Sequence, residues 1–448
     1  MSQKKTPHTL GHENIGKLLL EYSLPAIVAM TASSLYNIID RIFIGQGVGA
    51  LAISGLALTL PFMNLGVAIG ALIGAGAATL VSIRLGEKRG EEASYILGNT
   101  VVLNLILSSS YTVIALFFLE DILYLFGASE ATLPFAKQFM QIILLGNLFL
   151  HLYMGLNNIM RSSGYPQKAM FTTLATVGIN LILAPLFIFV FKWGIRGAAF
   201  ATVISQFAGF LITIIHFINK NSFLHFMKGH FRLRGDIIQG IFAIGMSPFV
   251  INVCACLIII IINLQLVKHG GDFAVGAYGI INSVLMFVLM VILGLTQGMQ
   301  PIAGYNFGAL QYERVRTVFR YTVIAATCIS VTGFLAGELL PRQISLAFTG
   351  NNELVGLSVT GMRIVMIFFP LVGFQMVTSN FFQSIGRAKI SVILTLTRQV
   401  IFLIPALIIL PPIFGLAGVW ASVPVADFFS IIVTAYVLKT QGKKVLGI

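Results

Sequence analysis

One carboxylate stands well inside a long apolar stretch of the N-terminal half of this chain. Asp40 follows Ser33, Tyr36 and Asn37 at intervals of three and four residues, so the four side chains fall on one stripe of a helix. An ionisable group within an apolar span is costly, and a carboxylate removed from water is suited to exchanging protons near neutral pH. The alternative is a structural role, in which Asp40 hydrogen-bonds Asn180 or pairs with a basic group. We favour the functional role, because no bulk water is there to solvate the charge.

Two other apolar stretches carry polar side chains at a similar depth. Asn180 lies near the middle of one, and Thr202 and Gln206 lie four residues apart on the other. Three helices of one bundle would thus bring polar groups together with Asp40. The constellation predicts a site at which a proton is taken up and released.

The C-terminal half carries a different set of charges. Asn263 stands where the repeat described below would put Asp40, so the two halves are not equivalent. Arg398 and Asp427 each lie deep inside an apolar stretch, and these stretches are consecutive and antiparallel. We expect the two to meet as a buried pair with a structural role, because a lone buried charge is worse than a paired one. Arg363 is the alternative partner for that carboxylate.

Further polar side chains inside the apolar stretches could line a substrate cavity or could hold helices together by hydrogen bonds. Both roles remain open from the sequence, and we assign to the cavity Asn37, Gln206, Asn158, Asn263, Asn282, Gln300, Gln375 and Asn380. The sequence contains no Walker loop and no His/Glu metal pattern, so we expect no metal and no cofactor.

The composition identifies the elements that must position these residues. The 448 residues are 57% hydrophobic and only 10% charged, and the mean hydropathy is +0.94. This excludes a soluble or disordered chain, and the continuous apolar runs exclude an outer-membrane barrel. Pro411-Pro412 marks the break between the last two of the predicted spans. We predict an all-α membrane protein with twelve spans, over residues 17–44, 51–80, 95–118, 133–160, 168–191, 195–219, 237–267, 273–304, 316–337, 354–383, 390–411 and 415–438.

The basic residues predict an orientation. The net charge of +13 would suggest nucleic acid for a soluble protein, but here it indicates basic loops on one side of a bilayer. Segments on the side of the N-terminus hold 20 of the 28 lysines and arginines, and the loops of the other side hold five. We therefore expect both termini in the cytoplasm and no nucleic-acid partner.

The two halves of the chain repeat each other at an offset that drifts only from 223 to 221 residues. Matched positions include Pro25 with Pro248, Gly76 with Gly298, and Gly164 with Gly386. Each copy holds six spans, so both have the same membrane orientation and are related by an axis along the membrane normal. We predict two pseudo-symmetric six-helix bundles, over residues 1–219 and 237–448, joined by a cytoplasmic loop over residues 220–236. Two bundles around a central cavity are typical of a transporter.

Several of these residues resemble the multidrug and toxic compound extrusion (MATE) family, most closely its bacterial DinF/MepA-type branch. The resemblance covers essentially the whole chain. It rests on Leu24-Pro25, on the run from Tyr36 through Asp40-Arg41 to Gly45, on the run Gln300 to Ala309, and on the paired motifs Arg161-x-x-Gly164 and Gln383-x-x-Gly386.

The resemblance implies two six-helix lobes and export of amphipathic, often cationic, drugs in exchange for H⁺ or Na⁺. It implies that Asp40 binds the coupling ion together with Tyr36, Asn180 and Thr202. Many relatives carry a second aspartate where this chain has Ala184. That departure favours a proton over Na⁺, although oxygens of Asn180 and Thr202 could still hold Na⁺.

We therefore expect an antiporter, not an enzyme, that lies in the bacterial inner membrane and works by alternating access. Its partners would be a small amphipathic or cationic compound and the lipid bilayer, and a monomer would suffice. The first alternative is a flippase for lipid-linked oligosaccharides, which would need unpaired cations such as Arg398 in the cavity. The second is a membrane scaffold or receptor, which the repeat and Asp40 make less favourable.

Overall fold

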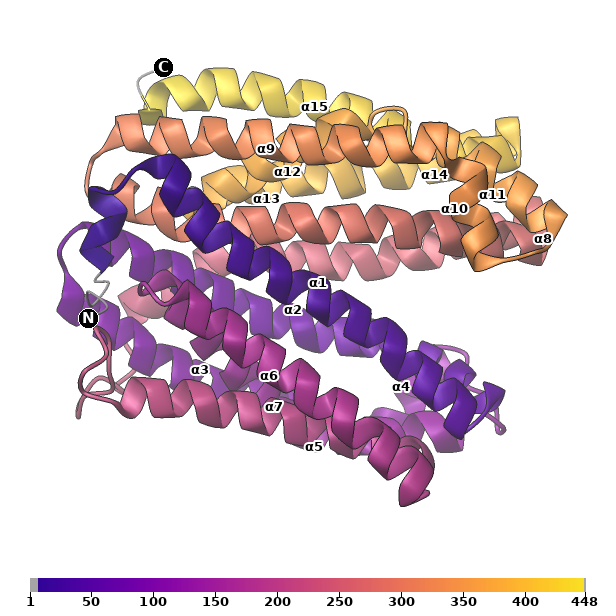
Figure 1. Ribbon diagram of the computed structural model, residues 1–448, viewed down its shortest axis with the longest axis horizontal. Coiled ribbons are helices and arrows are strands. Elements are labelled where there is room, and N and C mark those ends of the chain that lie inside the picture. The colour runs from indigo at the N-terminus through magenta and orange to yellow at the C-terminus, as the bar shows by residue number, and fades with distance from the viewer. Residues whose placement is uncertain (1–6, 447–448) are drawn as a thin grey trace. The chain divides into compact units, whose positions relative to one another are not determined.

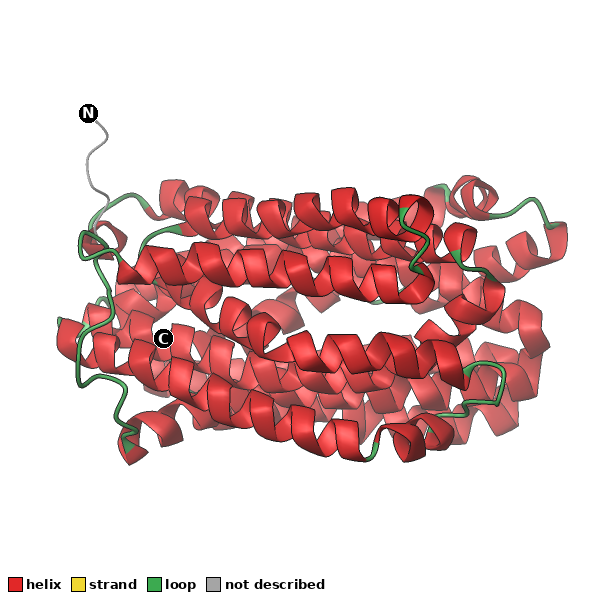
Figure 2. Cartoon of the chain, turned by 90° about the horizontal axis from the view of Figure 1, so that it is seen from below, coloured by secondary structure: helices red, strands yellow, loops and turns green. Residues whose placement is uncertain are grey.

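The computed structural model describes residues 7–446, and all regular structure within that range is helical (Figure 2). A short 3₁₀ helix over Pro7–Gly11 precedes the long helices. The first repeat forms α1 (Ile15–Gly47), α2 (Ala50–Gly86), α3 (Gly90–Phe117), α4 (Leu119–Leu125), α5 (Leu133–Ser162), α6 (Pro166–Pro185), a π-helical turn (Leu186–Val190) and α7 (Gly194–Ile218), as labelled in Figure 1.

The second repeat begins with α8 (Gly235–Gly308), which is two helices joined at Gly271, where φ is 65° and ψ is −166°. It continues with α9 (Tyr312–Leu339), α10 (Pro341–Phe348), α11 (Asn352–Val365), α12 (Phe369–Ser384), α13 (Ala388–Leu396), a π-helical turn (Thr397–Leu403), α14 (Ile404–Phe414) and α15 (Leu416–Leu446).

The positions of the predicted spans are confirmed. One of the spans is broken into two helices, and the predicted end of another is wrong. Within residues 7–446, eleven helices are long and apolar enough to cross a bilayer, and a twelfth span is the pair α11 and α12, bent by 55°. Pro370 is the second residue of α12, where its missing N–H costs nothing but the helix cannot continue backward unbroken. The break expected at Pro411-Pro412 is wrong, because both prolines lie inside α14 and the chain turns at Gly415. The short helices α4 and α10 were not expected.

The repeat is visible in the backbone itself. Positive φ angles recur at offsets of 221 or 222 residues, at the pairs Gly49 and Gly271, Lys88 and Leu310, Gly164 and Gly386, and Gly194 and Gly415. In the last pair φ is 58° at both positions, a conformation that glycine adopts without a Cβ penalty. The same turns therefore join the same helices in both copies.

The repeats and the compact units divide the chain differently. One unit contains the chain up to Glu13 together with Val28–Asn252, and the other contains Asn14–Ile27 with the chain from Val253 onward. The first part of α1, up to Ile27, thus belongs to the second unit, and the first part of α8, up to Asn252, belongs to the first unit. In each repeat, the start of the first helix therefore belongs to the unit that is formed mainly by the other repeat.

Within the first unit, α5 packs against α2, α3 and α7, and α6 packs against α7 (Figure 1). Glycines on α2 allow close contact with α5: a Cβ on Gly74 would lie 3.3 Å from the Cα of Gly155. Within the second unit, α12 packs against α9, α13 and α15.

The exchanged helix segments are held by close backbone contact at glycine. In the first unit, a Cβ on Gly245 would lie 1.7 Å from the carbonyl oxygen of Leu72. In the second unit, a Cβ on Gly298 would lie 2.3 Å from Oγ of Ser23, and that hydroxyl donates to the carbonyl oxygen of Leu295 at 3.3 Å. Such approach is the usual basis of helix association in lipid, where apolar burial gives little driving force.

We predict that Gly245→Ala destabilises the protein by about 1–3 kcal/mol, the usual range for overpacking, because the Leu72 carbonyl lies on the backbone and cannot move aside. The apparent melting temperature of the purified protein in detergent measures the effect. Gly178→Ala is the matched control, since Gly178 lies in α6 of the same unit with nothing within 4 Å of a built Cβ. Equal melting temperatures for the two variants would contradict the proposed contact.

Candidate functional site

Side chains from α1, α6 and α7 meet inside the first unit. The Asn180 amide nitrogen donates to Oη of Tyr36 at 3.0 Å and to Oγ1 of Thr202 at 3.2 Å. Tyr36 Oη and Thr202 Oγ1 lie 3.3 Å apart, and Ser205 Oγ lies 3.5 Å from the Asn180 nitrogen. Asn180, Thr202 and Ser205 are all buried. The structure therefore brings together three of the four residues assigned to the coupling-ion site and adds Ser205.

The hydroxyl and amide hydrogens of this cluster are all donated to acceptors. The Thr202 hydroxyl donates to the carbonyl oxygen of Ala198 at 3.0 Å, and the Ser205 hydroxyl donates to that of Thr202 at 2.8 Å. Thr202 can then only accept from Tyr36, whose hydroxyl donates to it. Asn180 supplies its two amide hydrogens to oxygen acceptors around it.

Two buried oxygens next to this cluster have no donor. Among the described residues, neither Oδ1 of Asp40 nor Oδ1 of Asn180 has a hydrogen-bond partner. Asp40 follows Tyr36 by four residues, so the carboxyl lies one helical turn further along the same face of α1. An unsatisfied buried acceptor costs free energy, and a proton or a cation would relieve that cost. Both oxygens are therefore available to accept a hydrogen bond.

An apolar core closes one side of the site. Ile44 lies four residues after Asp40, Ala184 lies four residues after Asn180, and all three helices contribute to one buried cluster that also contains Phe187, Ile188 and Ala198. Ile44 and Ala198 are fully buried. The polar groups therefore sit one turn from a dry core, where a charge is more strongly felt than in water.

The available ligands are oxygens. Within the part of the chain that the structure describes, no group of three or more His, Cys, Asp or Glu side chains could hold a metal ion. The position expected for a second carboxylate is Ala184, whose side chain is 1% exposed within the apolar core. A single carboxylate thus faces this cluster of hydroxyl and amide groups.

The residues assigned to a substrate cavity are spread over several helices, and their role stays a prediction. They vary in exposure: Asn37 and Asn263 are exposed, Gln375 is buried, and the half-buried ones are Asn158, Gln206, Asn282, Gln300 and Asn380. The Asn380 amide donates to the Met376 carbonyl of its own helix at 2.9 Å. That contact suits the alternative in which such residues stabilise helices.

Arg398 and Asp427 lie in contact in the second unit. Nε of Arg398 donates to Oδ1 of Asp427 at 2.7 Å, and the side chains are 25% and 4% exposed. Arg363 instead lies 4.0 Å from Glu338. The carboxylate of Asp427 is therefore bound by the guanidinium of Arg398 on the preceding span, in the π-helical turn.

A second buried polar cluster was missed from the sequence. His151 on α5 is fully buried, and its Nε2 lies 2.8 Å from the Gly66 carbonyl oxygen on α2. Because a carbonyl only accepts, Nε2 carries the hydrogen, and Nδ1 is left without a partner among the described residues. Asn147, one turn before His151, also has an unpartnered buried atom, as does Ser108 on α3. The spacing of Asn147 and His151 was the signal that could have found this cluster.

The chain is similar to transport proteins over nearly its whole length. A profile described as MatE matches residues 25–186 and again residues 248–408, so the two matches begin 223 residues apart, as the repeat does. The multidrug export protein MepA of Staphylococcus haemolyticus is 30% identical over 418 residues, covering 92% of this chain and 91% of that protein. MepA of Staphylococcus aureus (strain MRSA252) is 28% identical over 411 residues, covering 92% and 90%.

Solved structures give the same result. The MATE multidrug transporter DinF-BH, determined in complex with a bound compound, is 37% identical and superimposes with a TM-score of 0.92 over 100% of both chains. An outward-facing MATE family transporter of the MOP superfamily is 23% identical with a TM-score of 0.93, also over 100% of both chains, and supports the fold alone.

We predict that Asp427→Asn lowers the melting temperature, because it leaves a partly buried Arg398 without its charge partner. The loss should be smaller than the 3–5 kcal/mol typical of fully buried pairs, since the Arg398 side chain is 25% exposed. The double variant Arg398→Gln with Asp427→Asn should recover part of it. Thermal unfolding in detergent measures these losses. A double variant that loses more stability than the two single variants added together would contradict the pairing.

Proposed function

The chain belongs to the MatE family, and we propose that it is a proton-coupled antiporter that exports small amphipathic or cationic compounds across a bacterial plasma membrane. The observation that carries the coupling is the unpartnered Oδ1 of Asp40 beside a cluster whose hydrogens are all committed. The names of the relatives, multidrug export proteins and a multidrug transporter, support export of compounds of several kinds. Its partners are then such a compound and the lipid bilayer, with one chain sufficient.

In this proposal, the proton changes the hydrogen bonding among α1, α6 and α7. When Asp40 is ionised, it accepts hydrogen bonds only; once protonated, it can also donate, and Oδ1 of Asn180 is a free acceptor next to the cluster. Reorientation of the Asn180 amide would release Tyr36 or Thr202 from its present bond. The first unit would then change shape and release the compound outward, and loss of the proton toward the cytoplasm would reset it.

The energy is sufficient for useful export. One charge that crosses a potential of ~100 mV releases about 2.3 kcal/mol, which sustains a roughly 50-fold gradient of a neutral compound. No nucleotide is needed for export on that scale.

The position of Ala184 supports a proton over Na⁺. A Na⁺ ion prefers several oxygen ligands with enough negative charge, and this cluster offers a single carboxylate beside neutral hydroxyl and amide oxygens. A proton needs only one acceptor. The hydroxyls of Tyr36 and Thr202 would then tune Asp40 and would not coordinate an ion.

The orientation is proposed from charge. With 20 basic residues on the side of the N-terminus and five on the other, both termini lie in the cytoplasm. The oligosaccharide flippase has less support, because Arg398, the deep cation it would use for a pyrophosphate, is bonded to Asp427.

We predict that Asp40→Asn abolishes efflux of a cationic dye from proteoliposomes under an imposed pH gradient, since an amide cannot take up the proton. Glu130→Gln is the matched control, because it removes an exposed carboxylate from the loop before α5. Efflux driven by an imposed Na⁺ gradient alone would overturn the proton proposal. No efflux by the wild-type protein under either gradient would overturn export, and wild-type rates for Asp40→Asn would overturn the role of this residue.

Tyr36→Phe should slow the same efflux without abolishing it. The variant keeps the ring and the carboxylate but removes the oxygen that accepts from Asn180 and the hydrogen donated to Thr202. One net hydrogen bond of about 1 kcal/mol corresponds to a roughly five-fold change in rate. Tyr124→Phe, on the exposed face of α4, is the control, and an unchanged rate for Tyr36→Phe would exclude the hydroxyl from the coupling step.

A further inference from the structure

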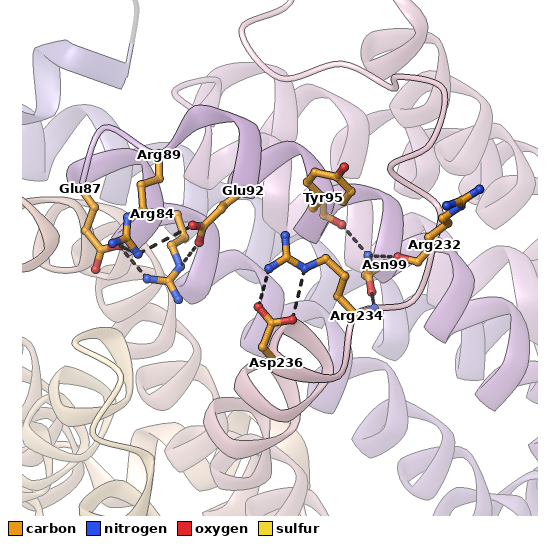
Figure 3. Close-up of polar contacts among 9 residues, drawn as sticks. All are labelled: Arg84, Glu87, Arg89, Glu92, Tyr95, Asn99, Arg232, Arg234 and Asp236. Atoms are coloured by element: carbon orange, nitrogen blue, oxygen red, sulfur yellow. Dashed lines mark hydrogen bonds and ion pairs between the residues drawn. The ribbon is translucent and has the colours of Figure 1, made fainter.

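The loop that joins the two repeats is tied to the first unit. Asn99 on α3 donates from its amide to the carbonyl oxygen of Arg232 at 3.0 Å and to that of His230 at 3.4 Å (Figure 3). Its carbonyl oxygen accepts from the backbone N–H of Arg234 at 2.9 Å. One buried asparagine thus fixes the backbone of residues 230–234, which form the end of the segment that we call the 219–234 loop.

Other contacts fix the remainder of the 219–234 loop. The N–H of Phe226 donates to the carbonyl of Phe217, and the N–H of Phe223 donates to the hydroxyl of Tyr165. The ring of His230 packs against the ring of Tyr95, with centroids 4.0 Å apart. The Arg234 guanidinium lies 5.3 Å from the centroid of the Tyr95 ring. The loop is therefore a built surface with a defined outward face.

That outward face is apolar where a water-exposed loop would be polar. Met227, Phe231 and Leu233 are 45%, 42% and 45% exposed. Exposed apolar residues are expected in membrane spans, but these three lie between the spans, which end at Ile218 and resume at Gly235. A segment so close to two span ends is near the membrane surface, a region where aromatic and apolar side chains are favoured.

Two cations alternate with these apolar residues. The backbone turns at Gly229, where φ is 96°, and hydrogen bonds from His230 to Met227 and from Arg232 to Gly229 close the turn. Lys228 and Arg232 lie on either side of Gly229, both exposed, and no described acidic residue pairs with either.

Three neighbouring arginines at this end of the unit are already paired. Arg84 and Arg89 form ion pairs with Glu87 and Glu92, as Figure 3 shows. Arg234 binds Asp236 through two hydrogen bonds, which raise the pKa of Arg234 above its ordinary value. In the same view, the guanidinium of Arg232 extends away from these pairs.

We propose that the turn at residues 227–233 binds the headgroup of an anionic phospholipid. Lys228 and Arg232 contact the headgroup charge, and Met227, Phe231 and Leu233 enter the acyl boundary beside it. Basic residues next to a membrane are attracted to anionic lipid, and an ordered loop adds little entropic cost when it binds. A soluble acidic partner would use the two cations but would leave the three apolar side chains unexplained.

The test places a reporter in the turn of the full-length protein. Trp193 and Trp420, the two tryptophans of the chain, are replaced by phenylalanine, and Phe231→Trp provides the single reporter. The protein is reconstituted in vesicles of phosphatidylcholine and phosphatidylglycerol, with bromine on the acyl chains of one lipid at a time. We expect brominated lipid to quench the reporter, and brominated phosphatidylglycerol to quench it several-fold more than brominated phosphatidylcholine.

The control variant matches the charge change and the spacing. Lys228→Gln with Arg232→Gln should remove the preference for phosphatidylglycerol, whereas Lys192→Gln with Arg196→Gln, an exposed Lys and Arg also four residues apart, should keep it. No quenching by either lipid would overturn the membrane contact and would leave an aqueous partner. Equal quenching by both lipids, or an undiminished preference in the first double variant, would overturn headgroup binding. None of these measurements depends on transport.

Discussion

Close backbone contact at glycine is the constraint on which the rest of this structure depends. In a bilayer, backbone groups are satisfied within each helix, and apolar side chains gain little by leaving lipid for protein. Helices must therefore associate by close approach, as they do where Gly245 meets the Leu72 carbonyl and where Gly298 meets Ser23. These contacts hold the exchanged segments, so each unit is completed by a piece of the other repeat.

The proposed coupling site follows from that arrangement. Beyond Ile27, α1 belongs to the first unit, and it carries Tyr36 and Asp40 to the side chains of α6 and α7. The apolar core one turn away shields one side of the site. A buried cluster with unpartnered acceptors beside it is sensitive to a single proton, which is the property that the proposed coupling needs.

Much of this was predictable because the bilayer imposes simple rules. Hydropathy placed the spans, and of the polar side chains that the sequence grouped with Asp40, Tyr36, Asn180 and Thr202 do meet. The bend between Val365 and Phe369 was missed, although Pro370 was its signal, because span length alone permitted an unbroken helix. Pro411-Pro412 misled in the opposite direction, because both prolines lie in the last turn of α14, and membrane helices tolerate proline where neighbouring groups satisfy the freed backbone. Contacts such as those of Asn99 and His151 depend on which helices face each other, and a single sequence does not carry that information.

The exchange of helix segments also orders the biogenesis of the protein. The first unit cannot be completed until Asn252 has been synthesised, well after its own six spans have been inserted. Asn14–Ile27 must wait longer, because its contact at Gly298 arises only when the second half of α8 reaches the membrane. This early apolar segment is thus among the last to find its final neighbours, and until then lipid or the insertion machinery must shelter it.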